Sequence, residues 1–131
     1  MKALRIYLTI NSVVAALSGL AFILFPKALT ASQVDVIPPG GLIFVKTVGG
    51  LILCIGLLDW YARNLKDGKM MEGVLLTNFF LHAISVSFDI SAIFQGIVNS
   101  SSEWYNIGFR SLLALGFLYF VFKNPLQKQK I

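Results

Sequence analysis

The sequence has little of what disulfides, metal sites and familiar catalytic motifs require. Its 131 residues include one cysteine and one histidine. A lone cysteine excludes a disulfide within the chain, so we expect Cys54 to be a packing residue. A lone histidine excludes a histidine pair at metal-ligand spacing, and no phosphate-binding glycine loop with a lysine is present. The sequence therefore contains no recognisable motif of a soluble enzyme.

Charged residues are also scarce. They make up 13% of the chain, whereas hydrophobic residues make up 56% and the mean hydropathy is +0.77. Four stretches come close to the roughly 20 residues that cross about 30 Å of hydrocarbon. We therefore predict an all-α fold, a four-transmembrane-helix bundle that forms a single integral membrane domain over residues 1–131. The predicted spans are residues 4–25, 42–61, 74–98 and 104–122.

Basic residues are distributed unevenly between the two ends of these spans. Of the eleven basic residues, only Lys27, Lys46 and Arg110 lie at the side of the membrane that holds the loops after the first and third spans. By the positive-inside rule, the side with the other eight is cytoplasmic, so both termini lie in the cytoplasm, and we expect a bacterial inner membrane. Because these residues are dispersed over membrane edges, the expected partner is the lipid bilayer with its anionic headgroups, and no nucleic acid is expected. The eight are Lys2, Arg5, Arg63, Lys66, Lys69, Lys123, Lys128 and Lys130.

The third span carries a polar stripe despite its apolar composition. Asn78, His82, Ser85 and Asp89 fall within an arc of roughly 60° at 100° per residue. Ionisable groups in hydrocarbon normally face the interior of a bundle or a wet cavity, and they often mark function. The stripe is therefore the main functional clue. Its members share one helix face, so we predict no hydrolytic triad, which draws its members from separate elements.

Depth in the bilayer limits which charged residues can pair. At a rise of 1.5 Å per residue, Asp89 lies about 24 Å along its span, towards the outer side. Lys46 and Arg110 enter from the outer side and reach about the same level. We therefore predict that Asp89 pairs with Lys46, with Arg110 or with both. Asp59 lies at the opposite boundary, where we expect it to pair with Arg63, four residues later.

The second span has one face that combines glycines with a cation. Glycines allow helices to approach closely in a membrane, so this face is predicted to meet a neighbouring helix. In the first span, Asn11 shares a face with Tyr7 and Ser18 and is predicted to add to a polar interior. The face of the second span consists of Lys46, Gly49, Gly50, Leu53 and Gly56.

The two halves of the chain have the same order of predicted elements. Each has a helix, an outer loop and a second helix with a cation about one turn inside it, Lys46 in one half and Arg110 in the other. This plan favours two parallel helical-hairpin repeats. Two unrelated hairpins with the same topology would look alike, so both interpretations stay open.

Each polar residue has a structural and a functional interpretation. Asp89, Lys46 and Arg110 either form a structural ion-pair network or hold a substrate, a proton or a headgroup. His82 either bonds to Asn78 or Ser85, as interior histidines do, or relays protons. Axial ligation of a haem or chlorophyll through His82 is disfavoured, because one histidine cannot supply two axial ligands.

Several short segments resemble small bacterial four-helix membrane proteins of the DoxX-like group. They are residues 44–50 (FVKTVGG), Gly56, residues 60–63 (WYAR) and His82. The outline is also similar to that of the eukaryotic scaffold protein of ergosterol biosynthesis. The resemblance spans about residues 4–98 and implies a four-helix membrane fold. The DoxX-like group includes a subunit of a quinone-reducing enzyme, so the resemblance implies quinone chemistry or an accessory role.

Several interpretations of the function remain open. The first is an accessory or scaffold subunit of a larger membrane complex, with other membrane subunits or further copies of the chain as partners, because the loops are too short for an independent active site. The second is an intramembrane site for a small amphiphile such as a quinone or lipid, whose polar head Asp89, Lys46 and Arg110 would hold. A third is a minimal proton-coupled carrier that uses His82 and Asp89. We expect no catalytic activity from the chain alone.

Overall fold

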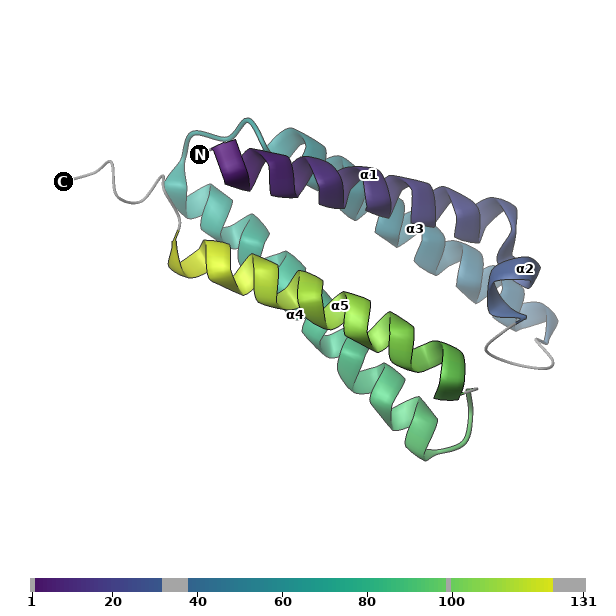
Figure 1. The fold of residues 1–131 in the computed structure, drawn as a ribbon. Helices are drawn as coiled ribbons and strands as arrows, with labels where there is room; N and C mark the ends of the chain where they lie inside the picture. Colours follow the sequence, from purple (N-terminus) through teal and green to yellow (C-terminus); the bar gives the residue numbers. More distant parts are fainter. Residues whose placement is uncertain (1, 32–37, 99, 124–131) are drawn as a thin grey trace. The chain divides into compact units, whose positions relative to one another are not determined.

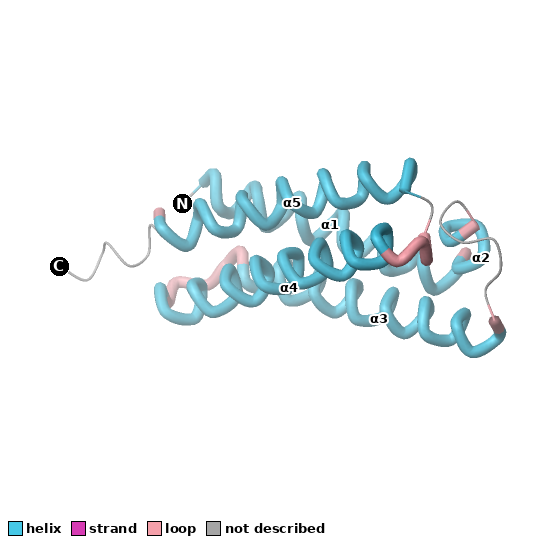
Figure 2. The backbone as a smooth tube through the Cα atoms, turned by 90° about the horizontal axis from the view of Figure 1, so that it is seen from below, coloured by secondary structure: helices cyan, strands magenta, loops and turns pink. Residues whose placement is uncertain are grey.

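A computed structural model describes residues 2–31, 38–98 and 100–123, and every regular element within these ranges is a helix (Figures 1 and 2). Four of the helices are long and apolar enough to cross a bilayer, which confirms the prediction of four spans. The protein is therefore a small integral membrane protein. In chain order the helices are α1 (Lys2–Leu24), α2 (Pro26–Thr30), α3 (Pro39–Ala62), α4 (Gly68–Phe94) and α5 (Ser100–Phe122).

Local sequence signals set the ends of the helices. Pro26 has no N–H to continue α1, and Phe25 before it leaves the helical conformation (φ −126°, ψ 46°), so the chain restarts as the short α2, which the sequence did not predict. The Asp67 side chain caps α4 by accepting hydrogen bonds from the backbone N–H groups of Lys69 and Met70. Beyond the other end of α4, Gly96 adopts a φ of +67°, which glycine tolerates without strain.

The chain divides into two compact units, Met1–Asn64 and Leu65–Ile131. We call the unit with α1, α2 and α3 the first hairpin, and the unit with α4 and α5 the second hairpin. Within each unit the two long helices run antiparallel, as their contacts show below. In each hairpin, the first long helix begins and the second long helix ends at the same end of the unit. We call this the terminal end of the hairpin. The opposite end is its loop end.

In the first hairpin, α1 and α3 are in backbone contact. A Cβ atom added to Gly19 would lie 2.6 Å from the carbonyl oxygen of Gly49, and one added to Gly56 would lie 2.9 Å from the carbonyl oxygen of Ser12. The Ser12 hydroxyl donates a 2.7 Å hydrogen bond to the Gly56 carbonyl. Small residues favour such close approach where lipid offers no hydrophobic force between helices. The prediction that Gly49 and Gly56 face a neighbouring helix is thus confirmed.

Other members of the predicted α3 face lie outside this contact. Lys46 is exposed, and a Cβ atom added to Gly50 would meet nothing within 4 Å. At 100° per residue, Gly49 and Gly56 differ by about 20°, whereas Lys46 and Gly50 point roughly 60–120° away from them. The contact with α1 is therefore centred on Gly49 and Gly56, and Lys46 and Gly50 take no part in it. Cys54 is also exposed, so its assignment as a packing residue was wrong.

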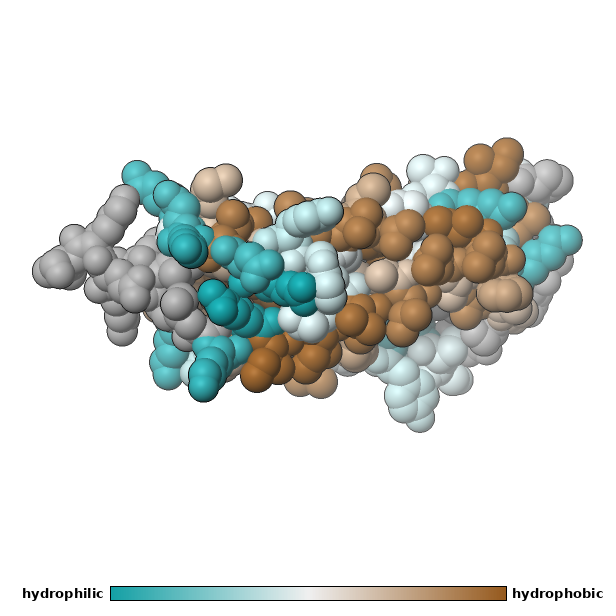
Figure 3. All heavy atoms as spheres, turned by 90° about the horizontal axis from the view of Figure 1, so that it is seen from above, coloured by the Kyte–Doolittle hydropathy of each residue, from teal (hydrophilic) through white to brown (hydrophobic). Residues whose placement is uncertain are grey.

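In the second hairpin, the buried residues are spaced by four and three along α4, and by four, seven and three along α5. This is the spacing of side chains that interlock along an extended helix pair. Many large apolar side chains of both hairpins are exposed, as expected for helices that face acyl chains. Such side chains, brown in Figure 3, cover much of the face drawn there. The buried residues of the second hairpin include Met71, Leu75 and Asn78 on α4 and Glu103, Ile107, Ala114 and Phe117 on α5.

Candidate functional site

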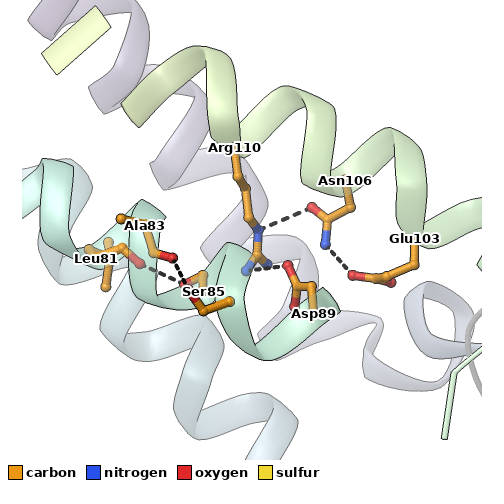
Figure 4. Close-up of polar contacts among 8 residues, drawn as sticks. Leu81, Ala83, Ser85, Asp89, Glu103, Asn106 and Arg110 are labelled. Carbon is orange, nitrogen blue, oxygen red and sulfur yellow. Dashed lines mark hydrogen bonds and ion pairs between the residues drawn. The ribbon is translucent and has the colours of Figure 1, made fainter. Parts of the chain in front are cut away.

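A chain of polar contacts crosses from α4 to α5 towards the loop end of the second hairpin (Figure 4). An Arg110 Nη1 atom lies 3.2 Å from Oδ2 of Asp89. Arg110 Nε donates a 3.1 Å hydrogen bond to Oδ1 of Asn106, and Asn106 Nδ2 donates a 2.8 Å hydrogen bond to Oε1 of Glu103. We call these four residues the charged seam. It confirms the predicted pairing of Asp89 with Arg110.

Helix geometry explains why these four residues meet. Glu103, Asn106 and Arg110 are spaced by three and four residues, so they line one face of α5. Asp89 faces them from α4. Glu103 also lies in the first turn of α5, where the partial positive charge of the helix N-terminus favours a carboxylate. The seam thus holds one guanidinium and two carboxylates.

Exposure differs along the seam. Glu103 is 4% exposed, whereas the side chains of Arg110 and Asp89 are 26% and 19% exposed. The seam is therefore closed around Glu103 and partly open at the ion pair. Oδ2 of Asp89, the atom that faces Arg110, is itself buried, so the exposed part of the pair lies elsewhere on the two side chains.

His82 lies two helical turns from Asp89 on α4, and its ring stacks on Phe117 with centroids 5.8 Å apart and planes inclined by 16°. Its Nε2 atom is buried and has no hydrogen-bond partner among the residues that the structure describes. Of the partners considered for His82, Ser85 donates its hydroxyl to the carbonyl of Leu81 in its own helix (2.8 Å, Figure 4). Asn78 Nδ2 likewise donates to the carbonyl of Val74 (3.1 Å).

The first hairpin has a separate polar pair. Asn11 Nδ2 donates a 2.5 Å hydrogen bond to Oδ2 of Asp59, and both residues are buried. Asp59 was predicted to pair with Arg63 instead. The Arg63 guanidinium lies over the ring of Trp60, 3.3 Å from its centroid. Asn11 is therefore polar and interior, as predicted, and its role is to join α1 to α3.

The structure thus distributes the predicted site residues over both hairpins. It brings Asp89 and Arg110 together, while the exposed Lys46 lies on α3 and its pairing with Asp89 stays a prediction. The sequence analysis missed Asn106 and Glu103, although their spacing from Arg110 was a readable signal of one shared helix face. In the described part of the chain, no three His, Cys, Asp or Glu residues are grouped to hold a metal ion.

Comparisons of this chain with protein-family models, with curated proteins and with solved structures find no match.

Proposed function

We propose that this protein is an accessory or scaffold subunit of a larger membrane complex. The observation that carries the proposal is that two polar pairs each join the two long helices of one hairpin. Asp89 pairs with Arg110 across α4 and α5, and Asn11 bonds to Asp59 across α1 and α3. Polar groups used in this way fix the fold, and they leave apolar outer surfaces through which other membrane subunits or further copies can dock.

The proposed arrangement has both termini in the cytoplasm of a bacterial inner membrane and two parallel hairpin repeats. The first helices of the two hairpins support a repeat. Each buries two large apolar side chains four residues apart, followed three residues later by a buried asparagine. The residues are Leu4, Leu8 and Asn11 in α1 and Met71, Leu75 and Asn78 in α4.

Purification from the native membrane in a mild detergent tests the accessory role. The protein should bring down a partner in fixed stoichiometry, and chemical cross-linking before solubilisation should capture the same partner. A cross-linked sample in which the chain occurs only alone, or only with further copies of itself, would contradict the proposal. A marker membrane protein of similar size, tagged identically, is the control for non-specific capture.

A second candidate function is an intramembrane site for a quinone or another lipid-like amphiphile. Two observations favour it: the partial exposure of the Asp89–Arg110 ion pair and the unpartnered Nε2 atom of His82. The ion pair would hold a polar head, and the apolar helix faces would hold the tail. The resemblance to the DoxX-like group supports the quinone version of this proposal.

Mass spectrometry of extracts from the purified protein tests this second function. A bound amphiphile should be present in the wild-type protein and lost in Asp89→Asn. Ser87→Ala is the matched control, because Ser87 is exposed on the same helix and its hydroxyl bonds to its own helix (3.0 Å). The absence of any bound species from the wild-type protein, or equal retention in Asp89→Asn, would rule this function out.

A further inference from the structure

We infer that each hairpin binds the headgroup of an anionic phospholipid at its terminal end, through Arg63 on Trp60 in the first hairpin and Lys123 on Tyr119 in the second. This inference does not depend on the accessory role. It concerns a different part of the molecule from the charged seam, which lies towards the loop end of the second hairpin.

In the first hairpin, α3 finishes in a cation held against an aromatic ring. The guanidinium carbon of Arg63 lies 3.3 Å from the centroid of the Trp60 ring, and Trp60 is exposed. Arg63 directly follows the last residue of α3, where the partial negative charge of the helix C-terminus favours a cation. Lys2 and Arg5, in the first turn of α1, are exposed at the same end of the hairpin because α1 and α3 are antiparallel.

The second hairpin repeats this arrangement with different residues. The Lys123 ammonium group lies 4.8 Å from the centroid of the Tyr119 ring and donates a 3.1 Å hydrogen bond to the Tyr119 hydroxyl. Both residues are exposed, and Lys123 directly follows α5. Lys69, in the first turn of α4, is exposed at the same end. In each hairpin, the second long helix is therefore followed directly by a cation that an aromatic ring orients.

Two acidic residues near these ends bond to other groups of the chain. Asp59 is completely buried and accepts a hydrogen bond from Asn11. Asp67 caps α4 through the backbone N–H groups of Lys69 and Met70. Glu72 is half-buried, one turn into α4. Of these acids only Asp59 is buried, whereas Asp67 is exposed in its capping position. The exposed cations Lys2 and Arg5 in the first hairpin, and Lys66, Lys69 and Lys123 in the second, outnumber the exposed acids named here, so the charge at these ends complements an anion.

The position along the helices identifies that anion as a lipid phosphate. Tryptophan and tyrosine at the ends of membrane helices lie at the level of the headgroups, with an apolar ring body and a polar edge. A cation stacked on such a ring lies at the same level, where it faces lipid phosphates. Anionic lipids attract each basic residue near the membrane surface by about 1 kcal/mol, which is roughly a five-fold effect on binding.

The two tryptophans of the chain provide the test, because they lie at opposite ends of their hairpins. Trp60 lies at the terminal end of the first hairpin, and Trp104 lies in the first turn of α5, at the loop end of the second. Trp104→Phe leaves Trp60 as the reporter, and Trp60→Phe leaves Trp104. Each variant is reconstituted in phosphatidylcholine vesicles that contain either brominated phosphatidylglycerol or brominated phosphatidylcholine, whose acyl chains quench tryptophan fluorescence on contact.

We expect brominated phosphatidylglycerol to quench Trp60 more strongly than brominated phosphatidylcholine at equal mole fraction. Arg63→Gln should lower this preference roughly five-fold, whereas Lys27→Gln, at the loop end, should leave it unchanged. Trp104 should show no preference between the two lipids. Both lipids are compared on the same variant. A variant that reconstitutes poorly would therefore give weaker fluorescence with both lipids and could not produce a difference in quenching between them.

The second hairpin is tested in the same way with Tyr119→Trp in a chain whose own tryptophans are replaced by phenylalanine. Lys123→Gln should then remove the preference for phosphatidylglycerol. Equal quenching by the two lipids at both reporters would overturn the inference. A preference that millimolar inorganic phosphate abolishes would also overturn it, because the site would then bind free anions and not lipid headgroups.

Discussion

The side chain of Asn106 joins two charged groups of opposite sign that do not touch each other. Its amide nitrogen donates to Glu103 while its amide oxygen accepts from Arg110. Only a side chain with both a donor and an acceptor can make this link. Aspartate lacks the donor, and leucine lacks both. The position of Asn106 therefore fixes the direction of the Arg110 side chain towards Asp89.

Replacement of Asp89 by asparagine removes the carboxylate that faces Arg110. We expect the free energy of unfolding to fall by about 1–2 kcal/mol, because interhelical polar contacts in membranes are modest and this pair is partly exposed. Titration with a denaturing detergent, followed by circular dichroism, measures the change. Combining Asp89→Asn with Arg110→Gln should cost less than the sum of the two single changes. Additive losses would show that the two side chains do not interact.

Asn11 supports a fully buried carboxylate in the first hairpin. Asn11→Ala would remove a hydrogen bond to Asp59, and we expect a loss of about 1–3 kcal/mol, as for other buried polar groups that lose a partner. The same detergent titration measures it. Thr9→Ala is the control, because the Thr9 hydroxyl bonds only to the carbonyl of Arg5 in its own helix, in an exposed contact. Equal effects of the two changes would refute a special role of Asn11.

At the scale of helices, the contact between α1 and α3 depends on the absence of side chains. A Cβ atom on Gly19 would lie 2.6 Å from a carbonyl oxygen and 2.7 Å from a backbone nitrogen, neither of which can rotate away. Gly19→Ala should therefore force the helices apart and cost about 1–3 kcal/mol in the free energy of unfolding.

Gly50→Ala provides the matched comparison on α3. An added Cβ atom there meets nothing within 4 Å, so we expect no loss, or a gain of up to about 1 kcal/mol from the higher helix propensity of alanine. Both variants are measured in the same detergent titration. A loss for Gly50→Ala as large as that for Gly19→Ala would contradict this account of the contact.

The helices themselves were largely predictable, because hydrophobic length and proline position are properties of the sequence alone. All four spans were found in this way, and the first was predicted to end at residue 25, next to Pro26. The short α2 was missed because five residues carry no periodicity. The exact centre of a packing face was also missed. Gly49 and Gly50 differ by one residue in the sequence but by about 100° around the helix, so only one of them meets α1.

At the scale of the whole molecule, the charges predict how the chain crosses the membrane. With both termini in the cytoplasm, the residues between α3 and α4 are also cytoplasmic. A fluorescent reporter that folds only in the cytoplasm should be active when fused after Asn64. A phosphatase that folds only outside should be active when fused after Ile97. The opposite pattern of activity would reverse the proposed orientation.

The candidate site was predictable only where depth and charge restricted the choice. Asp89 and Arg110 were paired correctly because few opposite charges reach the same level of the bilayer. Asp59 was assigned to the nearest cation in sequence, although its partner Asn11 lies 48 residues away. A sequence shows which residues share a helix face, but it does not show which other face they meet. The pairing of Asn11 with Asp59 therefore had to come from the structure.

The spacing of the small residues in the first hairpin has a consequence for insertions. Ser12 and Gly19 are seven residues apart, as are Gly49 and Gly56, so both contacts recur after two turns. An extra residue between Ser12 and Gly19 would rotate one contact by about 100° relative to the other and present a bulky side chain to α3. Only a whole heptad added to both α1 and α3 would keep both contacts, so this segment and residues 49–56 of α3 are expected to change length together, in steps of seven.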